Sequence, residues 1–262
     1  MNMWKTLLLS GCLCGLVGAQ TPVEKAEIQR QLMLRWCRIN LENQFQPGYR
    51  ATVANYFVGA DPDLDMTQGR VVATHIPLNL ALFGEGFFCL EGGRYTREGR
   101  FLWQEGRIIG PGGLPVLGYR LDEKQNISQG LGPIDFPMDP ESNLYLGKYN
   151  TFSWDSQGTL LGGSTSYNPV TQQDFTDYTP VYRLAIATFA QPHRLLRDQG
   201  TLLQAGSEAG AIRLEVAGEN RAGFVIPGSL ELSNVDPVEQ AYLWGRLDAA
   251  EPRRAKKPLK KR

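Results

Sequence analysis

The residues that could carry out hydrolysis are few and widely separated in this sequence. A nucleophilic serine needs a histidine base, and the only histidines are His75 and His193, each isolated from other catalytic residue types. The run Gly206–Gly210 places its serine one position too early for the Gly-x-Ser-x-Gly turn. Two carboxylates such as Asp122 and Glu123 could act as the acid and base of a glycosidase, but a sequence does not show the distance between the two carboxyl groups that this activity requires. We expect no catalytic residue and no enzymatic activity.

Acidic residues also suggest a metal site, which their spacing does not support. Asp61, Asp63 and Asp65 alternate as in a calcium loop. The sixth and twelfth positions of that loop are Met66 and Val72, where an EF-hand needs glycine and a bidentate carboxylate. We interpret this run as a solvated acidic loop and expect no metal. The glycines of the chain do not lead into a helix as in a phosphate loop or a dinucleotide fingerprint, so we expect no cofactor and no small-molecule substrate.

Charge is distributed unevenly along the chain. The formal net charge of the 262 residues is zero, but residues 253–262 hold seven of the 27 basic residues and no acidic one. Residues 1–252 therefore carry 20 positive and 27 negative charges, a net of −7. We expect 251–262 to be a disordered, solubilising basic tail; the alternative is that it binds anionic lipid or peptidoglycan. We expect no nucleic-acid partner.

The amino terminus has the pattern of a secretory signal peptide in residues 1–19. One lysine precedes the apolar run Leu7–Val17, and small residues end at Ala19, so we expect cleavage between Ala19 and Gln20. The run is too short for a membrane-spanning helix. An alternative is a lipoprotein box that ends at Cys12, in which Cys12 would be lipidated.

Cleavage after Ala19 would leave two cysteines in the mature chain, Cys37 and Cys89. They could pair in an oxidising compartment, but one falls in a predicted helix and the other in a predicted strand. Two buried free thiols are therefore at least as well supported. No cysteine spacing typical of a metal site occurs.

The central stretch, residues 76–119, alternates short apolar runs with glycine-containing turns. Leucines stand at every second position from 78 to 82, and further runs are Phe87–Leu90, Phe101–Trp103 and Leu114–Leu117. This spacing is too short for helices and predicts a chain of β-hairpins, because glycine supplies the positive φ of tight turns. Glycine (29) and proline (16) are frequent and charged residues make up 21% of the chain, which also favours a mainly β fold.

Helices are predicted at both ends of this β-rich body, which we place at residues 51–227. Thr21-Pro22 begins a helix that runs to about Leu41, within an amino-terminal unit of residues 20–50. Ile28, Leu32, Trp36 and Ile39 form an apolar stripe on it, and Asn43 can end it in a left-handed cap. A second helix starts at Pro237 behind Asp236 and ends near Ala250, within a unit of residues 228–250. Residues 165–179 are predicted to be a surface loop with anchoring aromatics, or alternatively a ligand loop.

Several ordered blocks go beyond what hairpins and helices require. The blocks are Asn40–Arg50, Thr67–Gly69, Leu78–Phe88, Tyr95–Phe101, Gly113–Gly118 and Gly228–Glu239. In order and spacing they resemble the flagellar hook and basal-body rod protein family, whose pattern includes P-L-D-L-A-I-x-G-x-G-F-F, then Y-T-R-x-G-x-F, then G-x-L-E-x-S-N-V. The resemblance covers about residues 26–247. It departs from the family at Asn79, often Asp there, at Cys89, usually polar there, and within the first block at Ile39, Glu42 and Gln46.

This resemblance implies an elongated, hairpin-rich β body flanked by an amino-terminal helix and a short carboxyl-terminal helix that pair with each other. It also implies a structural subunit of the flagellar rod or hook, in the basal body and periplasm, that polymerises helically with itself and with other rod or hook subunits to transmit torque. The matching residues would contact neighbouring subunits: Asn40, Leu41, Asn43, Gly48, Tyr49, Arg50, Leu230, Ser233, Asn234, Val235 and Val238. Family members are typically exported through the flagellar channel without a cleaved signal, so the export route stays open. The alternative function is a monomeric secreted envelope-binding protein.

Overall fold

The computed structural model describes residues 21–53 and 62–250. The predicted signal peptide, Cys12 and the basic tail lie outside these ranges. Helix α1 spans Pro22–Glu42 and helix α2 spans Pro237–Ala249. The strands are β1 Thr52–Val53, β2 Asp63–Leu64, β3 Val71–Ala73, β4 Leu80–Phe83, β5 Phe87–Leu90, β6 Arg94–Thr96, β7 Leu102–Gln104, β8 Arg107–Ile109, β9 Leu117–Arg120, β10 Gly132–Pro133, β11 Met138–Asp139, β12 Leu144–Tyr145, β13 Thr151–Trp154, β14 Thr159–Asn168, β15 Gln173–Phe189, β16 Leu196–Gln199, β17 Leu202–Gln204, β18 Ile212–Val216, β19 Phe224–Pro227 and β20 Ser229–Glu231. Neither helix of the described residues is long and apolar enough to cross a membrane.

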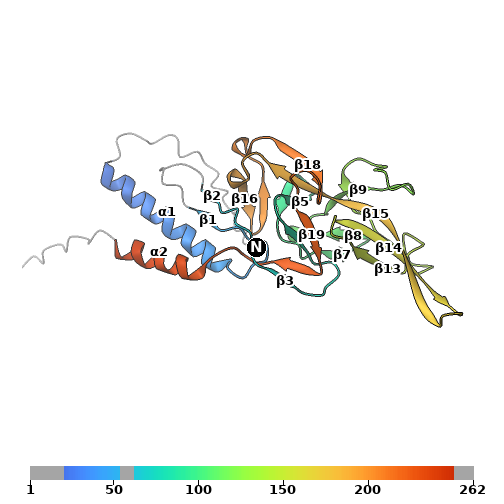
Figure 1. The fold of residues 1–262 in the computed structure, drawn as a ribbon. Coiled ribbons are helices and arrows are strands. Elements are labelled where there is room, and N and C mark those ends of the chain that lie inside the picture. Colours follow the sequence, from blue (N-terminus) through green and yellow to red (C-terminus); the bar gives the residue numbers. More distant parts are fainter. Residues whose placement is uncertain (1–20, 54–61, 251–262) are drawn as a thin grey trace, which may run out of the picture.

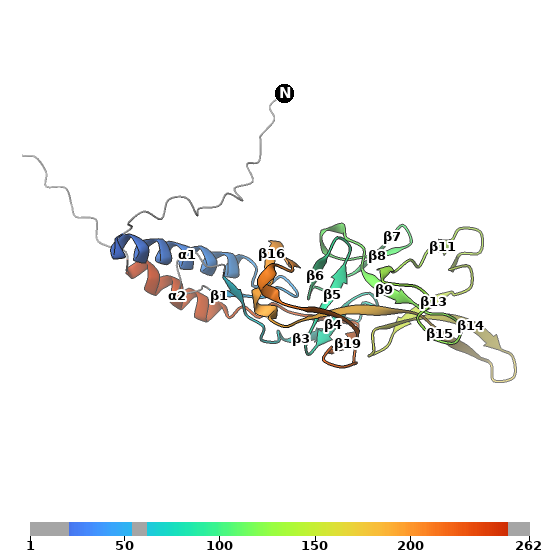
Figure 2. The same cartoon turned by 90° about the horizontal axis from the view of Figure 1, so that it is seen from above.

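The molecule is elongated, with the helix pair at one end and the β body beyond it (Figures 1 and 2). This confirms the mainly β fold class with one helix near each end of the described chain. Helices α1 and α2 lie side by side, and the Arg30 guanidinium donates to the main-chain oxygen of Leu247 at 3.0 Å. The two terminal segments of the sequence thus form one structural unit.

The ends of both helices follow their local sequence signals. At the start of α1, Thr21 and Glu24 form a capping box, in which the Glu24 amide donates to the Thr21 hydroxyl and the Thr21 amide to the Glu24 carboxylate. Asp236 caps α2 by accepting from the amides of Val238 and Glu239. The expected left-handed cap at Asn43 is wrong: its φ is −107°, and its side-chain amide instead donates to the Ile39 carbonyl at 2.8 Å.

The face that α1 buries differs from the predicted apolar stripe. The buried positions of the helix are Arg30, Cys37 and Asn40. Ile28 is exposed, and the other members of the stripe are only half-buried. A helix that packs against a single helix can cover only part of a wide apolar face, so the rest of the stripe stays at the surface.

Strand β15 organises the β body. It is 17 residues long and pairs antiparallel with β14, β9, β5 and β18 along its length. The main sheet runs β10-β9-β15-β5-β6-β17-β16. The predicted run Phe87–Leu90 is β5 itself, and its hairpin to β6 turns at Gly92 and Gly93, both at positive φ. The prediction of a hairpin chain in this stretch is confirmed.

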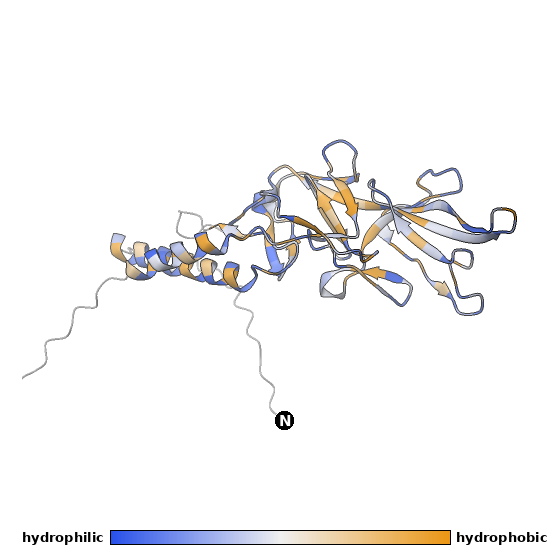
Figure 3. Ribbon diagram, turned by 60° about the horizontal axis from the view of Figure 1, so that its bottom comes forward, coloured by the Kyte–Doolittle hydropathy of each residue, from blue (hydrophilic) through white to orange (hydrophobic). Residues whose placement is uncertain are grey.

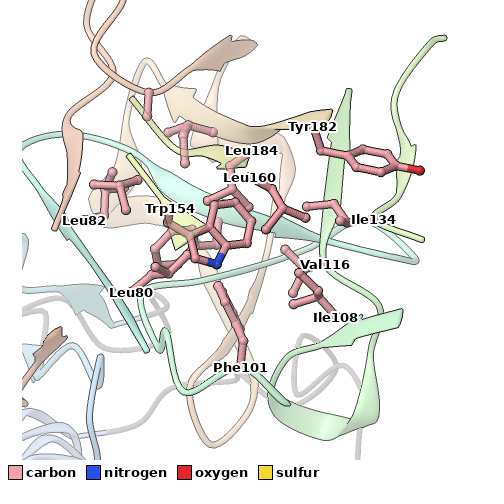
Figure 4. Packing of buried hydrophobic residues seen from close by; sticks show 14 of the residues in the cluster. Leu80, Leu82, Phe101, Ile108, Val116, Ile134, Trp154, Leu160, Tyr182 and Leu184 are labelled. Atoms are coloured by element: carbon pink, nitrogen blue, oxygen red, sulfur yellow. The ribbon is translucent and has the colours of Figure 1, made fainter. Parts of the chain in front are cut away.

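The core of the body lies between these strands. Side chains from segments far apart in sequence converge there, among them Leu80, Phe101, Val116, Leu160 and Leu184 (Figure 4). Hydrophobic residues are concentrated in the body's strands, whereas the helices carry mixed colours (Figure 3). Cys89 is buried in a second cluster beside this core, and both it and Cys37 are free thiols.

Residues 165–179 are not a loop. They belong to the outer part of the β14–β15 hairpin, whose pairing continues from Thr159 with Arg183 out to Asn168 with Gln173. The stretch is rich in threonine and aromatic residues, which are frequent in strands. The turn begins at Asn168, whose side-chain oxygen accepts from the Val170 amide at 2.9 Å.

Candidate assembly site at the junction of helices and body

The residues predicted to contact other subunits gather where the helix pair meets the β body. Six are buried within the chain itself: Asn40, Gly48, Tyr49, Arg50, Leu230 and Val235. Four are half-buried: Leu41, Asn43, Ser233 and Asn234. Val238 alone among the eleven is exposed, at 77%. Most of this set therefore holds the described chain together internally, and Val238 is available at the surface of α2.

Asn40 joins both helices to the strand that follows α1. Its side-chain oxygen accepts from the Thr52 amide at 2.8 Å and from the Tyr49 hydroxyl at 3.2 Å. Its side-chain nitrogen donates to the Thr52 carbonyl at 2.9 Å and to the Gln240 side chain of α2 at 3.1 Å. All four hydrogen-bonding positions of this buried amide are used, which fixes the register of the helix pair on β1.

Asn234 makes the equivalent connection from the carboxyl-terminal side. Its side-chain oxygen accepts from the Ala51 amide at 2.6 Å. Its nitrogen donates to the carbonyls of Asp65 and Thr67 at 3.0 and 3.1 Å. One side chain just before α2 thus binds two segments that follow α1 in the sequence.

A buried carboxylate lies at the centre of the junction. Glu231, fully buried, accepts from Arg50 at 2.8 Å and lies 3.5 Å from the Nε atom of Arg97. The Gly69 amide donates to it at 2.9 Å. Burial lowers the pKa of both arginines, and the nearby Glu231 opposes this shift. An arginine keeps its charge in proteins, so the junction contains two buried cations that share one anion.

The guanidinium groups also bind the main chain of neighbouring segments. Arg50 donates to the Thr67 carbonyl, and Arg97 donates to the carbonyls of Leu82 and Gly84. Five segments, those carrying Arg50, Thr67, Leu82, Arg97 and Glu231, are therefore joined through three charged side chains. Buried charges in this arrangement specify one geometry more than they add stability.

A second buried carboxylate, Glu98, binds the turn after α1. It accepts from the side chains of Gln46 and Thr201 at 2.9 and 2.6 Å. Gly48 lies directly against it: its φ is +68°, and an added Cβ would lie 2.2 Å from the Glu98 amide nitrogen. Only glycine fits this position, because its backbone conformation is left-handed and the Gly48 and Glu98 backbone segments are in direct contact.

Arg197 covers the same turn from β16. Its guanidinium carbon lies 4.1 Å from the centroid of the Tyr49 ring, and it donates to the Arg50 carbonyl. Burial lowers the pKa of Arg197 and raises the pKa of the Tyr49 hydroxyl. The ring–guanidinium contact is a desolvated cation–π pair.

Sequence reasoning missed the charged residues of this junction as site residues. The blocks that carry the family resemblance include Arg97, Glu98 and Glu231, but the partners of these residues are far away in sequence. The available signal was a charge inside an otherwise apolar, hairpin-forming stretch. Among the described residues no group of three or more metal-ligating side chains occurs. His193 and Ser207 lie in neighbouring short helices, η3 (Pro192–Arg194) and η4 (Ser207–Ala209). Within residues 62–250 no hydrogen bond joins the His193 and Ser207 side chains.

Two similarities to characterised proteins agree with this architecture. Over 220 residues the chain is 27% identical to the flagellar basal-body rod protein FlgF of Salmonella typhimurium, an alignment that covers 76% of each chain. Over 61 residues it is 36% identical to the flagellar hook protein FlgE of Rhizobium meliloti, covering 23% of this chain and 15% of the hook protein. No family model matches the chain. The relatives are structural flagellar proteins, and their similarity supports a structural role in the flagellum, at the basal-body rod or hook, for this chain.

Proposed function

We propose that this protein is a structural subunit of the flagellar basal-body rod or hook, that it polymerises with itself and with other such subunits, and that it transmits torque. The observation that carries the proposal is the junction built from Asn40, Glu231 and Asn234. It locks the paired terminal helices onto the β body, so a load on the helices passes to the body without a flexible hinge between them.

In this proposal the eleven predicted residues act in two ways. The buried members, such as Asn40 and Arg50, fix the orientation of the helix pair and influence assembly indirectly. The exposed member, Val238 on α2 at 77% exposure, contacts neighbouring subunits directly, together with Tyr242 of the same helix, which is 64% exposed and lies outside the eleven. Val23 on α1, 70% exposed, extends the same kind of surface.

Purified basal bodies test the rod role. We expect the protein among their subunits, and we expect Val238→Asp with Tyr242→Ser to reduce its incorporation while the purified variant keeps the wild-type unfolding midpoint. The matched control is Val53→Asp, a change at a half-exposed residue of β1 outside the helix pair. Absence of the protein from basal bodies purified from cells that express it normally would contradict the proposal.

The amino-terminal segment decides the export route in this proposal. Export by general secretion with cleavage after Ala19 predicts a mature chain that begins at Gln20, whereas export through the flagellar channel predicts an uncleaved start. Sequencing of the mature terminus distinguishes the two routes.

The second candidate, a monomeric envelope-binding protein, is favoured by one observation, the seven basic residues of 253–262. It predicts that deletion of these residues releases the protein from isolated cell wall or from anionic vesicles. If deletion of residues 253–262 does not change retention on cell wall or vesicles, and the protein enters basal bodies, the envelope-binding function is refuted and the structural role stands.

A further inference from the structure

The outer part of the β14–β15 hairpin projects from the body as a two-stranded arm, residues 164–179. It extends beyond the body at the end opposite the helices (Figures 1 and 2). The pairing of β13 with β14 ends at Gly163, and β9 pairs with β15 only from Tyr182. Within the described residues the arm therefore has no third strand. A lone two-stranded ribbon is marginally stable in water, so such a ribbon gains from a binding partner.

The side chains of the arm are those of a binding surface. Tyr167, Phe175 and Tyr178 are 62%, 62% and 46% exposed, and Val170 at the tip is 89% exposed. The arm contains Asp174 and Asp177 and no lysine or arginine. Exposed aromatics beside acidic residues suit a partner surface that is both apolar and basic.

A groove of this kind lies at the other end of the same strand. Its volume is about 390 Å³, and Met66, Phe87 and Phe189 contribute apolar walls. Arg50, Arg97 and Arg221 also line it, and a smaller adjoining pocket of about 90 Å³, which shares Arg221, adds Arg213. The groove volume is at the lower end of the range for pockets that bind small molecules, about 300–1,000 Å³.

The groove is basic although residues 1–252 together carry a net charge of −7. Its four arginines face three carboxylates: the buried Glu231, Asp65, whose charge acts on Arg50, and Glu85, which pairs with Arg221 at 3.1 Å at the exposed rim. Arg50 is 2% exposed, and its Nε atom has no hydrogen-bond acceptor. The groove thus offers apolar contact and positive charge, while the Arg50 Nε donor that lacks a partner is itself buried.

The arm and the groove of one molecule cannot meet. Strand β15 runs continuously from Gln173 in the arm to Phe189 in the groove wall. At about 3.3 Å per residue this separates them by roughly 50 Å along a strand that the sheet holds extended. An arm that binds such a groove must therefore bind the groove of another molecule.

We propose, on the basis of the assembly role above, that the arm of one copy of this chain inserts into the Arg50–Arg97–Arg221 groove of the next copy. The aromatic side chains of the arm occupy the apolar part of the groove, and Asp174 and Asp177 pair with its rim arginines. The contact is heterologous, because two different surfaces meet, so repetition of it produces an open head-to-tail array.

Charge reversal tests the contact in the purified full-length protein. Sedimentation velocity over a concentration series is measured for the wild type, for an arm variant (Asp174→Arg, Asp177→Arg) and for a groove variant (Arg213→Glu, Arg221→Glu). We expect concentration-dependent self-association of the wild type and about tenfold or greater weakening in each variant, because like charges then face each other. A 1:1 mixture of the two variants restores association, since each arm then finds a groove of opposite charge.

Lys124→Glu, an exposed charge reversal outside both surfaces, is the matched control and leaves association unchanged. Cross-linking gives an independent readout: a copy with Asp174→Cys and a copy with Arg213→Cys form a disulfide-linked dimer when mixed in the presence of oxidised glutathione, which accepts the two electrons and is reduced to glutathione. In the described residues the native thiols, Cys37 and Cys89, are buried, and single-cysteine variants mixed with wild type control for cross-links through any other native thiol. A wild type that stays monomeric, variants that associate like the wild type, or a mixture that fails to recover each overturn the proposal.

These results are distinguishable from the test of function. An arm variant that enters basal bodies as well as the wild type refutes the arm–groove contact and leaves the rod role intact. A protein that associates through arm and groove but is absent from basal bodies refutes the rod role and leaves the contact.

Discussion

Replacement of Glu231 by glutamine tests whether buried charge holds the helices onto the body. Glutamine has nearly the same size and can still accept from the Gly69 amide, so packing changes little. It removes the charge that faces both Arg50 and Arg97. Removal of one member of a buried ion pair destabilises proteins by about 3–5 kcal/mol, because the remaining charge is desolvated without compensation.

The expected loss for Glu231→Gln lies near the lower end of that range, at about 3 kcal/mol. Two cations lose their counter-charge, which increases the loss. Both also keep main-chain acceptors, however, since Arg50 binds the Thr67 carbonyl and Arg97 binds the Leu82 carbonyl. These hydrogen bonds retain part of the solvation that the carboxylate supplied.

Urea unfolding followed by far-ultraviolet circular dichroism measures the loss. With a denaturant slope of about 3 kcal/mol/M, the midpoint decreases by roughly 1 M at an unchanged slope. The matched control is Glu42→Gln in the exposed pair with Arg38, which are 3.7 Å apart on α1. This control should cost less than about 0.5 kcal/mol. A loss below about 1 kcal/mol for Glu231→Gln, or equal losses for the two variants, would refute the reasoning.

Three further predictions, two from substitutions and one from the chemistry of Cys89, test other parts of the same structure. Gly48→Ala should unfold at a clearly lower denaturant concentration than Gly92→Ala: both positions have positive φ, but only at Gly48 would the new Cβ collide with backbone, 2.2 Å from the Glu98 amide nitrogen. Asn40→Ala should lose about 1–3 kcal/mol of unfolding free energy, because the Thr52 main chain loses both partners in a buried site; a loss equal to that of exposed Gln31→Ala would contradict this. Burial raises the pKa of Cys89 to about 12, so its thiol should resist a thiol reagent at pH 8 until the protein unfolds. Its native pKa lies above the value of about 8.5 for an unfolded chain, so the stabilisation is present below pH 8.5 and should decrease as the pH rises towards 12, which unfolding curves at pH 8 and 10 measure.

The features that the sequence predicted correctly are those with local causes. The helix starts at Thr21-Pro22 and behind Asp236 depend on residues within three positions of each other. The β5–β6 hairpin depends on an apolar run followed by paired glycines. Such signals need no knowledge of the rest of the fold, so they survive in a single sequence.

The features that the sequence could not predict have partners far along the chain. Arg50 and Glu231 are 181 positions apart, and nothing near either residue indicates the other. The arm was missed for a different reason. Its strands mix polar and aromatic residues and carry no core-facing apolar row, since every residue from Ser164 to Thr179 except the half-buried Thr176 is exposed. The usual strand signal comes from burial of one face, and it is absent from a ribbon that no other part of the chain covers.

The junction also explains why residues that resemble subunit contacts are buried in a single chain. If torque passes from neighbouring helices into this molecule, it must cross from α2 to the body through the short segment between Glu231 and Asp236. Glu231 anchors that segment to two arginines, and Asn234 anchors it to three main-chain groups on the other side. A load along the segment is then shared among directed polar contacts, which have one favourable geometry, whereas apolar packing alone tolerates sliding. Loss of these anchors should therefore impair rigidity and assembly before it abolishes folding, and a Glu231→Gln protein that is still folded should enter basal bodies poorly.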